Sequence, residues 1–254
     1  MNLIEAFDIR NDEVISLVGG GGKTTLMFAL ARELVASNHK VITTTTTHIG
    51  ADEPTKFKAS LLQEENEKIL LSILPENLLN YAHLTVVKQF SPEKERFAGY
   101  LPEVIDRLAA LGMADVIIEA DGARRKPIKA PNATEPVIPA STTLVIPVVG
   151  MDALGTALNE DNAFRPEIIS RLTGLKLGES ITEDTIAALM THPEGIAKGT
   201  PASARIIPLL NKADKGNSAA AESIARKILA ESESIKRVVV GQVLINELLV
   251  IARP

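Results

Sequence analysis

The sequence contains no cysteine and no tryptophan, and tyrosine occurs twice in 254 residues. Without cysteine, the chain cannot form a disulfide, bind a metal through a thiolate or use a thiolate as a nucleophile. Aromatic residues make up 3% of the chain, so the core must be built from aliphatic side chains. Such a core is typical of a parallel β-sheet covered by helices. The four histidines also lack the spacing of zinc ligands: His39, His48, His83 and His192.

The chain also lacks an excess of positive charge and long apolar runs. Its formal net charge is −5, which argues against nucleic acid as a main partner, because binding to phosphates needs a basic surface. No apolar run approaches the thickness of a bilayer, and no apolar stretch follows a basic segment at the start of the chain. We therefore expect a cytoplasmic protein with no membrane and no nucleic-acid partner.

Short β-branched runs alternate with segments of helical periodicity along most of the chain. This alternation predicts an α/β fold with a doubly wound, mainly parallel sheet. We expect residues 1–254 to form a single domain of the P-loop NTPase type, in which residues 153–198 are a helical insert or a lid. The expected strands are 14–18, 40–44, 84–87, 115–119, 142–149, 205–210, 238–243 and 248–251. The expected helices are 23–37, 60–74, 101–111, 166–173, 183–190 and 218–231.

The most informative stretch is a glycine loop between an apolar strand and a helix. Glycines allow successive backbone N–H groups to turn towards an anion, and the N-terminus of the helix adds positive charge. Lys23 would reach the outer phosphates of a nucleotide, and the Thr24 hydroxyl would ligate the accompanying Mg²⁺. The loop is therefore predicted to bind a nucleoside triphosphate. Its residues are Gly19, Gly20, Gly21, Gly22, Lys23, Thr24 and Thr25.

The glycine loop departs from the Walker A pattern at its start. Leu17 stands where the pattern G-x-x-x-x-G-K-[ST] has its first glycine. Val18 stands where one large group of dimeric nucleotide hydrolases carries a second lysine. The short form also resembles the loop of the ATP-dependent muramyl ligases, which makes a ligase an alternative. Proteins with this type of loop often pair across the nucleotide, so a homodimer is left open.

Two carboxylates follow the apolar strand 115–119. Glu119 and Asp121 lie two residues apart and so share one side of an extended chain. In phosphate-loop proteins a carboxylate in this position orients Mg²⁺ or the attacking water. We predict metal binding and catalysis for this pair and leave open which one faces the metal. The alternative is an Asp-Gly turn with a glutamate beside it.

A basic segment comes directly after these carboxylates. It would clamp an anionic substrate or stabilise charge on a transferring phosphoryl group, with Arg124 as the catalytic candidate. The alternative is a solvated basic loop. Its charged residues are Arg124, Arg125, Lys126 and Lys129.

Late in the chain, an apolar strand ends in Asn211-Lys212-Ala213-Asp214. This order resembles the guanine-reading motif of GTPases, in which the aspartate accepts hydrogen bonds from guanine and the lysine stem packs along the base. Asn211, Lys212 and Asp214 are thus candidate nucleotide-binding residues, although the same residue types are frequent in plain turns. The sequence leaves GTP or ATP open.

A threonine run ends near the carboxyl end of the strand 40–44, where open α/β sheets bind ligands. Thr46, Thr47 or His48 would touch phosphate, metal-bound water or substrate there. Thr43 and Thr44 are better explained by strand propensity.

Further motifs complete a pattern that extends from about Val18 to Asp214. They are the glycine loop, the threonine run 43–48, the segment 119–124 (EADGAR), 135–139 (EPVIP), 149–155 (VGMDALG), 192–195 (HPEG) and 210–214 (LNKAD). This combination resembles the YqeC family, described as accessory proteins of selenium-dependent molybdenum hydroxylases. The resemblance implies a nucleotide-binding maturation factor that acts on a selenium- or molybdenum-containing cofactor or its enzyme.

The resemblance also suggests a further cluster around Arg165. Arg165 would act as a catalytic or sensor arginine, or cap Glu160 at the surface, and we favour the cap. The other members of the cluster are Asp152, Gly155 and Pro166.

Together these features predict Mg²⁺-dependent binding and hydrolysis of GTP or ATP. Two alternatives come from other functional classes. One is an ATP-dependent kinase or ligase that activates a small anionic substrate. The other is a non-catalytic delivery protein in which nucleotide binding favours one partner.

Overall fold

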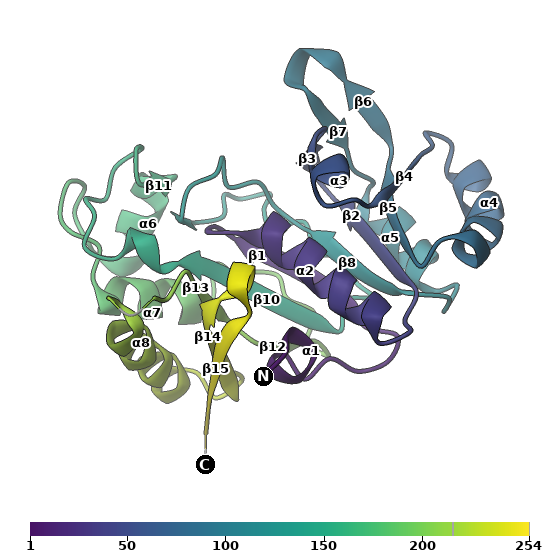
Figure 1. The fold of residues 1–254 in the computed structure, drawn as a ribbon. Coiled ribbons are helices and arrows are strands. Elements are labelled where there is room, and N and C mark those ends of the chain that lie inside the picture. The colour runs from purple at the N-terminus through teal and green to yellow at the C-terminus, as the bar shows by residue number, and fades with distance from the viewer. Residues whose placement is uncertain (215, 254) are drawn as a thin grey trace.

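A ten-stranded, mainly parallel sheet forms the centre of the computed structural model, which describes residues 1–214 and 216–253 (Figure 1). All neighbouring strands pair in parallel except β14 and β15. The predicted α/β fold with a mainly parallel sheet is therefore confirmed. The strand order is β15 (Glu247–Ala252), β14 (Arg237–Gln242), β13 (Leu209–Asn211), β10 (Leu144–Gly150), β1 (Val14–Gly19), β8 (Asp115–Glu119), β2 (Val41–Thr45), β5 (His83–Val87) and β4 (Ser60–Gln63), and β12 (Arg205–Ile206) also pairs with β10.

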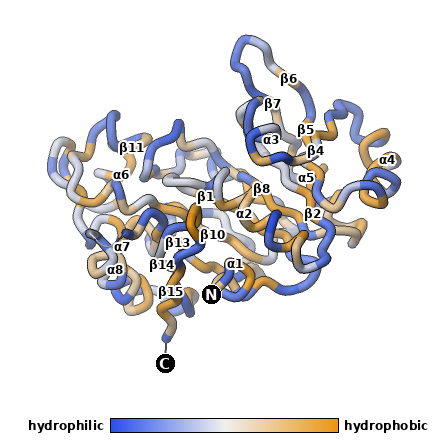
Figure 2. Tube along the Cα trace, viewed as in Figure 1, coloured by the Kyte–Doolittle hydropathy of each residue, from blue (hydrophilic) through white to orange (hydrophobic). Residues whose placement is uncertain are grey.

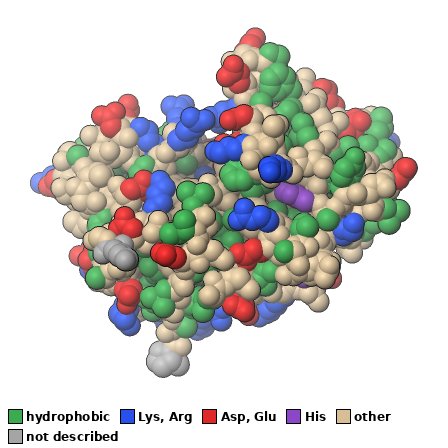
Figure 3. Space-filling view, viewed as in Figure 1, with side chains coloured by type: hydrophobic (Ala, Val, Ile, Leu, Met, Phe, Trp, Pro, Cys, Tyr) green, Lys and Arg blue, Asp and Glu red, His purple; other side chains and the backbone are tan. Residues whose placement is uncertain are grey.

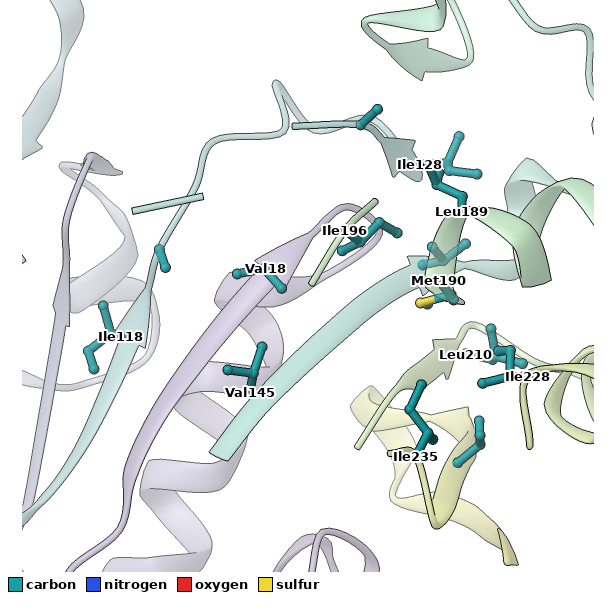
Figure 4. Packing of buried hydrophobic residues seen from close by; sticks show 14 of the residues in the cluster. Val18, Ile118, Ile128, Val145, Leu189, Met190, Ile196, Leu210, Ile228 and Ile235 are labelled. Atoms are coloured by element: carbon teal, nitrogen blue, oxygen red, sulfur yellow. The ribbon is translucent and has the colours of Figure 1, made fainter. Parts of the chain in front are cut away.

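Helices cover both faces of this sheet because the strand side chains alternate between two apolar clusters. In β1, Ile15 and Leu17 pack with α1 and α2, whereas Val14 and Val18 pack in the cluster on the opposite face. Figure 4 shows part of this second cluster, in which Val18 and Val145 come from strands and Leu189 from a helix. The first face carries α1 (Leu3–Ala6) and α2 (Lys23–Ala36), and the second carries α4 (Glu67–Asn80), α5 (Pro102–Ala109), α6 (Pro166–Thr173), α7 (Glu183–Thr191) and α8 (Ser218–Glu231).

A small antiparallel sheet projects from the carboxyl edge of the central sheet, at the upper right of Figure 1. Its base is tied to β2, because the N–H of Gly99 donates to the Thr47 carbonyl and that of Tyr100 to the Thr45 carbonyl. The sequence pattern gives no sign of this sheet. It consists of β3 (His48–Gly50), β7 (Arg96–Ala98) and β6 (Gln89–Ser91), with α3 (Glu53–Lys56) and the 3₁₀ turn η1 (Pro92–Lys94) beside it.

The predicted helix 60–74 is wrong at both ends. Residues 60–63 form the edge strand β4, and α4 begins only after Asn66, whose side chain accepts hydrogen bonds from the N–H groups of Lys68 and Ile69. Pro75 lies inside α4 instead of ending it. The helix continues because its apolar stripe of Leu70, Leu74 and Leu78 is buried, which offsets the backbone hydrogen bond that proline removes.

The predicted strand 205–210 is divided into β12 and β13 at Ile207 and Pro208. Proline has no N–H for the ladder, and the Pro208 carbonyl accepts from Val239. The segment 153–198 contains α6, α7 and β11 (Ala163–Phe164), which pairs with β9 (Ile128–Lys129). Its apolar residues join the cluster on the second face of the sheet. The remaining 3₁₀ turns are η2 (Met151–Ala153) and η3 (Val243–Ile245).

Hydrophobic stretches follow the central strands, and hydrophilic ones lie in the loops and at the tip of the β6–β7 hairpin (Figure 2). Over the described part of the chain, none of the helices combines the length and the apolarity needed to cross a membrane.

Candidate functional site

The predicted site residues converge because parallel strands end at the same edge of the sheet. Leu17 in β1 pairs with Glu119 in β8, and Gly150 in β10 pairs with Asn211 in β13. The glycine loop, the carboxylates and the Asn211 motif therefore meet although they are far apart in the sequence.

The glycines are required by both backbone angles and close packing. Gly19, Gly21 and Gly22 have φ angles of 96°, 77° and 122°, which disfavour any residue with a side chain. A Cβ atom on Gly20 would lie 2.7 Å from the Lys126 carbonyl oxygen, and one on Gly22 would lie 2.5 Å from Asn211 Nδ2. A Cβ on Gly21 would overlap the backbone of Gly150. Packing alone therefore accounts for part of the glycine run.

The N-terminus of α2 offers a group of N–H donors. The N–H groups of Gly20 and Gly21 are used internally, by the carbonyls of Val148 and Lys126. In contrast, within the described chain the backbone N–H groups of residues 22–25 have no hydrogen-bond acceptor. Four successive donors at a helix N-terminus form the arrangement that binds phosphate groups in proteins.

Lys23 lies at the bottom of this site and is 4% exposed. Its Nζ donates to the Gly19 carbonyl at 2.5 Å and lies 3.0 Å from Asp121 and 3.7 Å from Glu119. Burial alone would lower the pKa of Lys23, but the two carboxylates outweigh it and hold the pKa above its ordinary value. The ammonium group is therefore charged where the free N–H donors begin.

Asp121 belongs to a buried ion network. Its Oδ2 accepts from the Gly19 N–H at 3.0 Å and lies 2.9 Å from Lys129 Nζ, while its Oδ1 faces Lys23. Lys129 is fully buried and also binds Glu135 at 2.6 Å, and Glu135 in turn pairs with Arg165. We call these five residues the buried ion network: Lys23, Asp121, Lys129, Glu135 and Arg165.

The buried ion network corrects two expectations. Lys129 does not join the other basic residues at the surface but neutralises Asp121 and Glu135 inside the protein. Arg165 binds Glu135 rather than capping Glu160, and its guanidinium lies 4.3 Å from the Phe164 ring. Burial alone would raise the pKa of Glu135, but Arg165 and Lys129 outweigh it and lower this pKa. One signal for a buried lysine was present, since Lys129 stands between the apolar Ile128 and Ala130.

Glu119 and Thr24 form a separate pair beside the free N–H groups. The Thr24 hydroxyl donates to Glu119 Oε2 at 2.8 Å. Burial raises the pKa of Glu119 above its ordinary value, and the opposing effects of Lys23 and Thr24 are smaller. Among the described residues, no three acidic or histidine side chains cluster closely enough to hold a metal by themselves.

A cleft of about 300 Å³ opens above the glycine loop. Its floor contains residues 21–25 and Glu119, and its walls come from the turn 122–126 and from the small sheet. Arg124, Arg125 and Lys126 also line the cleft. Figure 3 shows Lys and Arg side chains gathered around the hollow between the two parts of the molecule.

The Asn211 motif divides into a buried and an exposed part. Asn211 donates from Nδ2 to the Gly21 carbonyl at 2.8 Å and accepts from the Val243 N–H, so it braces the glycine loop. Lys212 is exposed at the cleft and pairs with Asp152 at 2.6 Å. The exposed Asp214 accepts from the Gly216 N–H.

In the threonine run, only His48 reaches the cleft. The Thr46 hydroxyl donates to the Val137 carbonyl, and the hydroxyl groups of Thr45 and Thr47 bind each other. Arg96 also lines the cleft but was not predicted, because the sequence shows no signal that β7 folds back over the glycine loop. We call four residues at its outer edge the cleft rim: His48, Arg96, Arg124 and Arg125.

Comparison with known proteins agrees with this arrangement of motifs. The family model described as YqeC protein matches residues 15–167. The chain belongs to the YqeC family. A relative from Escherichia coli (strain K12), named "Uncharacterized protein YqeC", is 35% identical over 215 residues, which cover 84% of this chain and 81% of the relative. The family match includes the glycine loop, Glu119 and the whole buried ion network, whereas residues 211–214 lie outside it.

Proposed function

We propose that this chain binds a nucleoside triphosphate, GTP or ATP, together with Mg²⁺ at the glycine loop and hydrolyses it. The observation that supports this most strongly is the row of four free N–H donors beside the charged Lys23. With this role, the α/β fold would be of the P-loop NTPase type. Lys23 would hold the outer phosphates, and Arg124 would face charge that develops on the transferring phosphoryl group.

The oxygen atoms next to the glycine loop suit Mg²⁺. This ion prefers one or two protein oxygen ligands and completes its shell with water and substrate phosphates. The Thr24 hydroxyl and the Glu119 carboxylate provide such oxygens, 2.8 Å apart in the structure. Bound there, Mg²⁺ would neutralise phosphate charge. We therefore assign the metal-side role to Glu119.

Asp121 suits a different task. Both of its oxygens are already taken by the Gly19 N–H, Lys23 and Lys129, so it is poorly placed to ligate a metal. We propose that Asp121 positions Lys23 and the start of the glycine loop. The predicted metal contact of Asp121 is thereby replaced by a positioning role in this proposal.

Base selection would fall to the exposed part of the Asn211 motif. Asp214 has the carboxylate that a guanine base requires, while Asn211 is occupied with bracing the loop. A role as maturation factor for a selenium- or molybdenum-containing cofactor enzyme rests on the resemblance to the YqeC family alone.

An assay of nucleotide hydrolysis tests the proposal. We expect Mg²⁺-dependent release of nucleoside diphosphate and phosphate by the unmodified protein, and its loss in Thr24→Val and Lys23→Met. Lys40→Met is the matched control, because Lys40 does not line the cleft and its Nζ donates to the Tyr81 carbonyl at the surface. Thermal unfolding would verify that each variant is folded. Equal turnover in folded Lys23→Met and in Lys40→Met would contradict the assignment.

A kinase or ligase is the second candidate, favoured by the basic side chains that line the cleft beyond the glycine loop. Such an enzyme would transfer the phosphoryl group to a small anionic substrate rather than to water. Detection of a phosphorylated product in place of free phosphate would support it. A delivery protein would bind the nucleotide but form neither a phosphorylated product nor free phosphate.

A further inference from the structure

The cleft rim carries positive charge that the protein itself does not neutralise. Within residues 1–214 and 216–253, no carboxylate lies within ion-pair distance of Arg96, Arg124 or Arg125. The two acidic residues that line the cleft are already engaged, Glu53 by Lys56 at 3.9 Å and Glu119 by Lys23. Uncompensated arginines that face one concave space are a common feature of anion-binding sites.

The strand register of the small sheet places part of the rim. Residues directly opposite each other on paired strands share a face, and in this sheet Gly50 pairs with Arg96 and His48 with Ala98. His48 and Arg96 thus lie diagonally on the face that lines the cleft, and Gly50 puts no side chain between them. The alternate residues Ile49 and Phe97 are buried in the apolar cluster, which fixes the orientation of the sheet. Burial, with the charges of Lys94 and Arg96, lowers the pKa of His48, so its imidazole is neutral at pH 7.

On the opposite side of the cleft rim, two residues have a strained backbone conformation. Arg124 and Arg125 have φ angles of 48° and 62°, in the left-handed region that non-glycine residues rarely occupy. The Arg124 guanidinium lies 4.9 Å from the centre of the Phe164 ring, which limits its movement. Two consecutive arginines are therefore fixed at the cleft at some cost to stability, although their exposed side chains contribute little to the core.

We propose that Arg96, Arg125 and His48 form a subsite for a second small anionic substrate, which carries a phosphate or carboxylate group, beside the nucleotide. The inference rests on the proposed nucleotide binding and adds the residues that would hold a second anion beside the nucleotide. The subsite lies on β3, β7 and the turn after Asp121, whereas the phosphates of a nucleotide are served by the N-terminus of α2 and by Lys23. The cleft, of about 300 Å³, suits a small molecule rather than a polymer.

Calorimetric titration with two anion probes tests this subsite. The protein is first saturated with Mg²⁺ and a non-hydrolysable nucleotide analogue, and inorganic phosphate or citrate is then added in separate titrations. We expect at least one probe to bind without displacing the analogue. Its affinity should fall about tenfold in the double variant Arg96→Gln/Arg125→Gln, because two charge-assisted contacts are removed. The control Lys40→Gln removes a charge away from the cleft and should bind the probe as the unmodified protein does.

Three outcomes would overturn the proposal. The first is that neither probe binds. The second is that each bound probe displaces one molecule of the nucleotide analogue and so occupies the glycine loop. Binding that is unchanged in the double variant would indicate an adventitious ion only. If the unmodified protein takes up no analogue, the proposed function fails separately, and the titrations are made on the free protein. Probe binding that depends on Arg96 and Arg125 would then still support the subsite, and its absence would refute it.

Discussion

Two charged regions lie at the carboxyl edge of the sheet, the buried ion network and the cleft rim. They differ in whether their charged side chains have partners of opposite charge. In the buried ion network each charge has an opposite partner within about hydrogen-bonding distance, as in the contacts of Lys129 with Asp121 and Glu135. In the cleft rim, a short way along the chain, Arg124 and Arg125 have no carboxylate partner among the described residues. Charged groups that are removed from water must be paired inside the protein, whereas charged groups at an open cleft stay hydrated until a ligand binds.

This difference separates residues that position the glycine loop from residues that face a ligand in the cleft. The buried ion network fixes Lys23 and the start of the glycine loop, and it connects them through Arg165 to the segment 153–198. The cleft rim provides charge for molecules that enter from solvent. Substitutions in the network should therefore affect stability first, and substitutions in the rim should affect ligand binding first.

The largest effect is expected for Lys129→Met. The substitution leaves the buried carboxylates of Asp121 and Glu135 without their shared cation, which costs about 3–5 kcal/mol of unfolding free energy. Urea denaturation would measure this loss. Lys126→Met is the matched control, because Lys126 is only partly buried and its Nζ contacts a backbone carbonyl at the surface. Similar losses in both variants would show that Lys129 in the buried ion network contributes no more to stability than a lysine at the surface.

Glu135→Gln should change how stability depends on pH. The pKa of Glu135 is lowered in the folded protein from its ordinary value of 4.5. Its ionised form therefore stabilises the fold above about pH 4.5, and this contribution is lost as the pH falls through the lower, folded-state pKa. The variant should be less stable at pH 7 by about 1.5–3 kcal/mol, the typical value of hydrogen bonds to charged groups, and this difference should shrink in acid. The exposed Glu194→Gln is the control, and a deficit that stays constant with pH would contradict the assignment.

Asn211→Ala and Asp214→Ala should separate the two parts of their motif. Asn211→Ala removes two buried hydrogen bonds and should cost about 1–3 kcal/mol while weakening GTP and ATP alike. Asp214→Ala should leave stability unchanged and abolish any difference between the two nucleotides. Thermal unfolding and nucleotide titration together measure both effects. A stable Asn211→Ala protein that loses only guanine selectivity would instead make Asn211 a base reader.

The smallest change in stability is expected for Arg125→Gln. Its side chain is exposed, so the unfolding free energy should stay within about 0.5 kcal/mol of that of the unmodified protein. Added inorganic phosphate, however, should raise the melting temperature of the unmodified protein and of Lys40→Gln more than that of this variant. The same shift in all three proteins would show that the rim does not bind the anion.

The local sequence pattern was sufficient to predict the α/β fold with its mainly parallel sheet and to single out residues that lie around the glycine loop. Apolar strands followed by Gly19–Thr25, Glu119 or Asn211 place those residues at one edge of a parallel sheet. The sequence pattern did not show which charged side chains pair with each other inside the protein. The apolar neighbours of Lys129 signal its burial, but nothing local shows that it contacts Asp121, because that contact depends on the strand pairing of β9 with β11.

The small sheet was missed for a related reason. Its strands have three residues each, too few for a period-two pattern, and the edge strand β4 was concealed by leucines that also fit a helix. The buried apolar stripe of α4 then allowed the helix to continue past Pro75, against the usual preference.

Titration with fluorescent GTP and fluorescent ATP, with and without Mg²⁺, tests most directly whether the glycine loop binds a nucleotide with Mg²⁺. Thr24→Val is measured beside the unmodified protein, because this substitution removes a proposed metal ligand without leaving a buried charge unpaired. We expect saturable binding of at least one nucleotide, weakened about tenfold by omission of Mg²⁺ or by the substitution. Binding of neither nucleotide, or binding indifferent to both Mg²⁺ and Thr24, would contradict it.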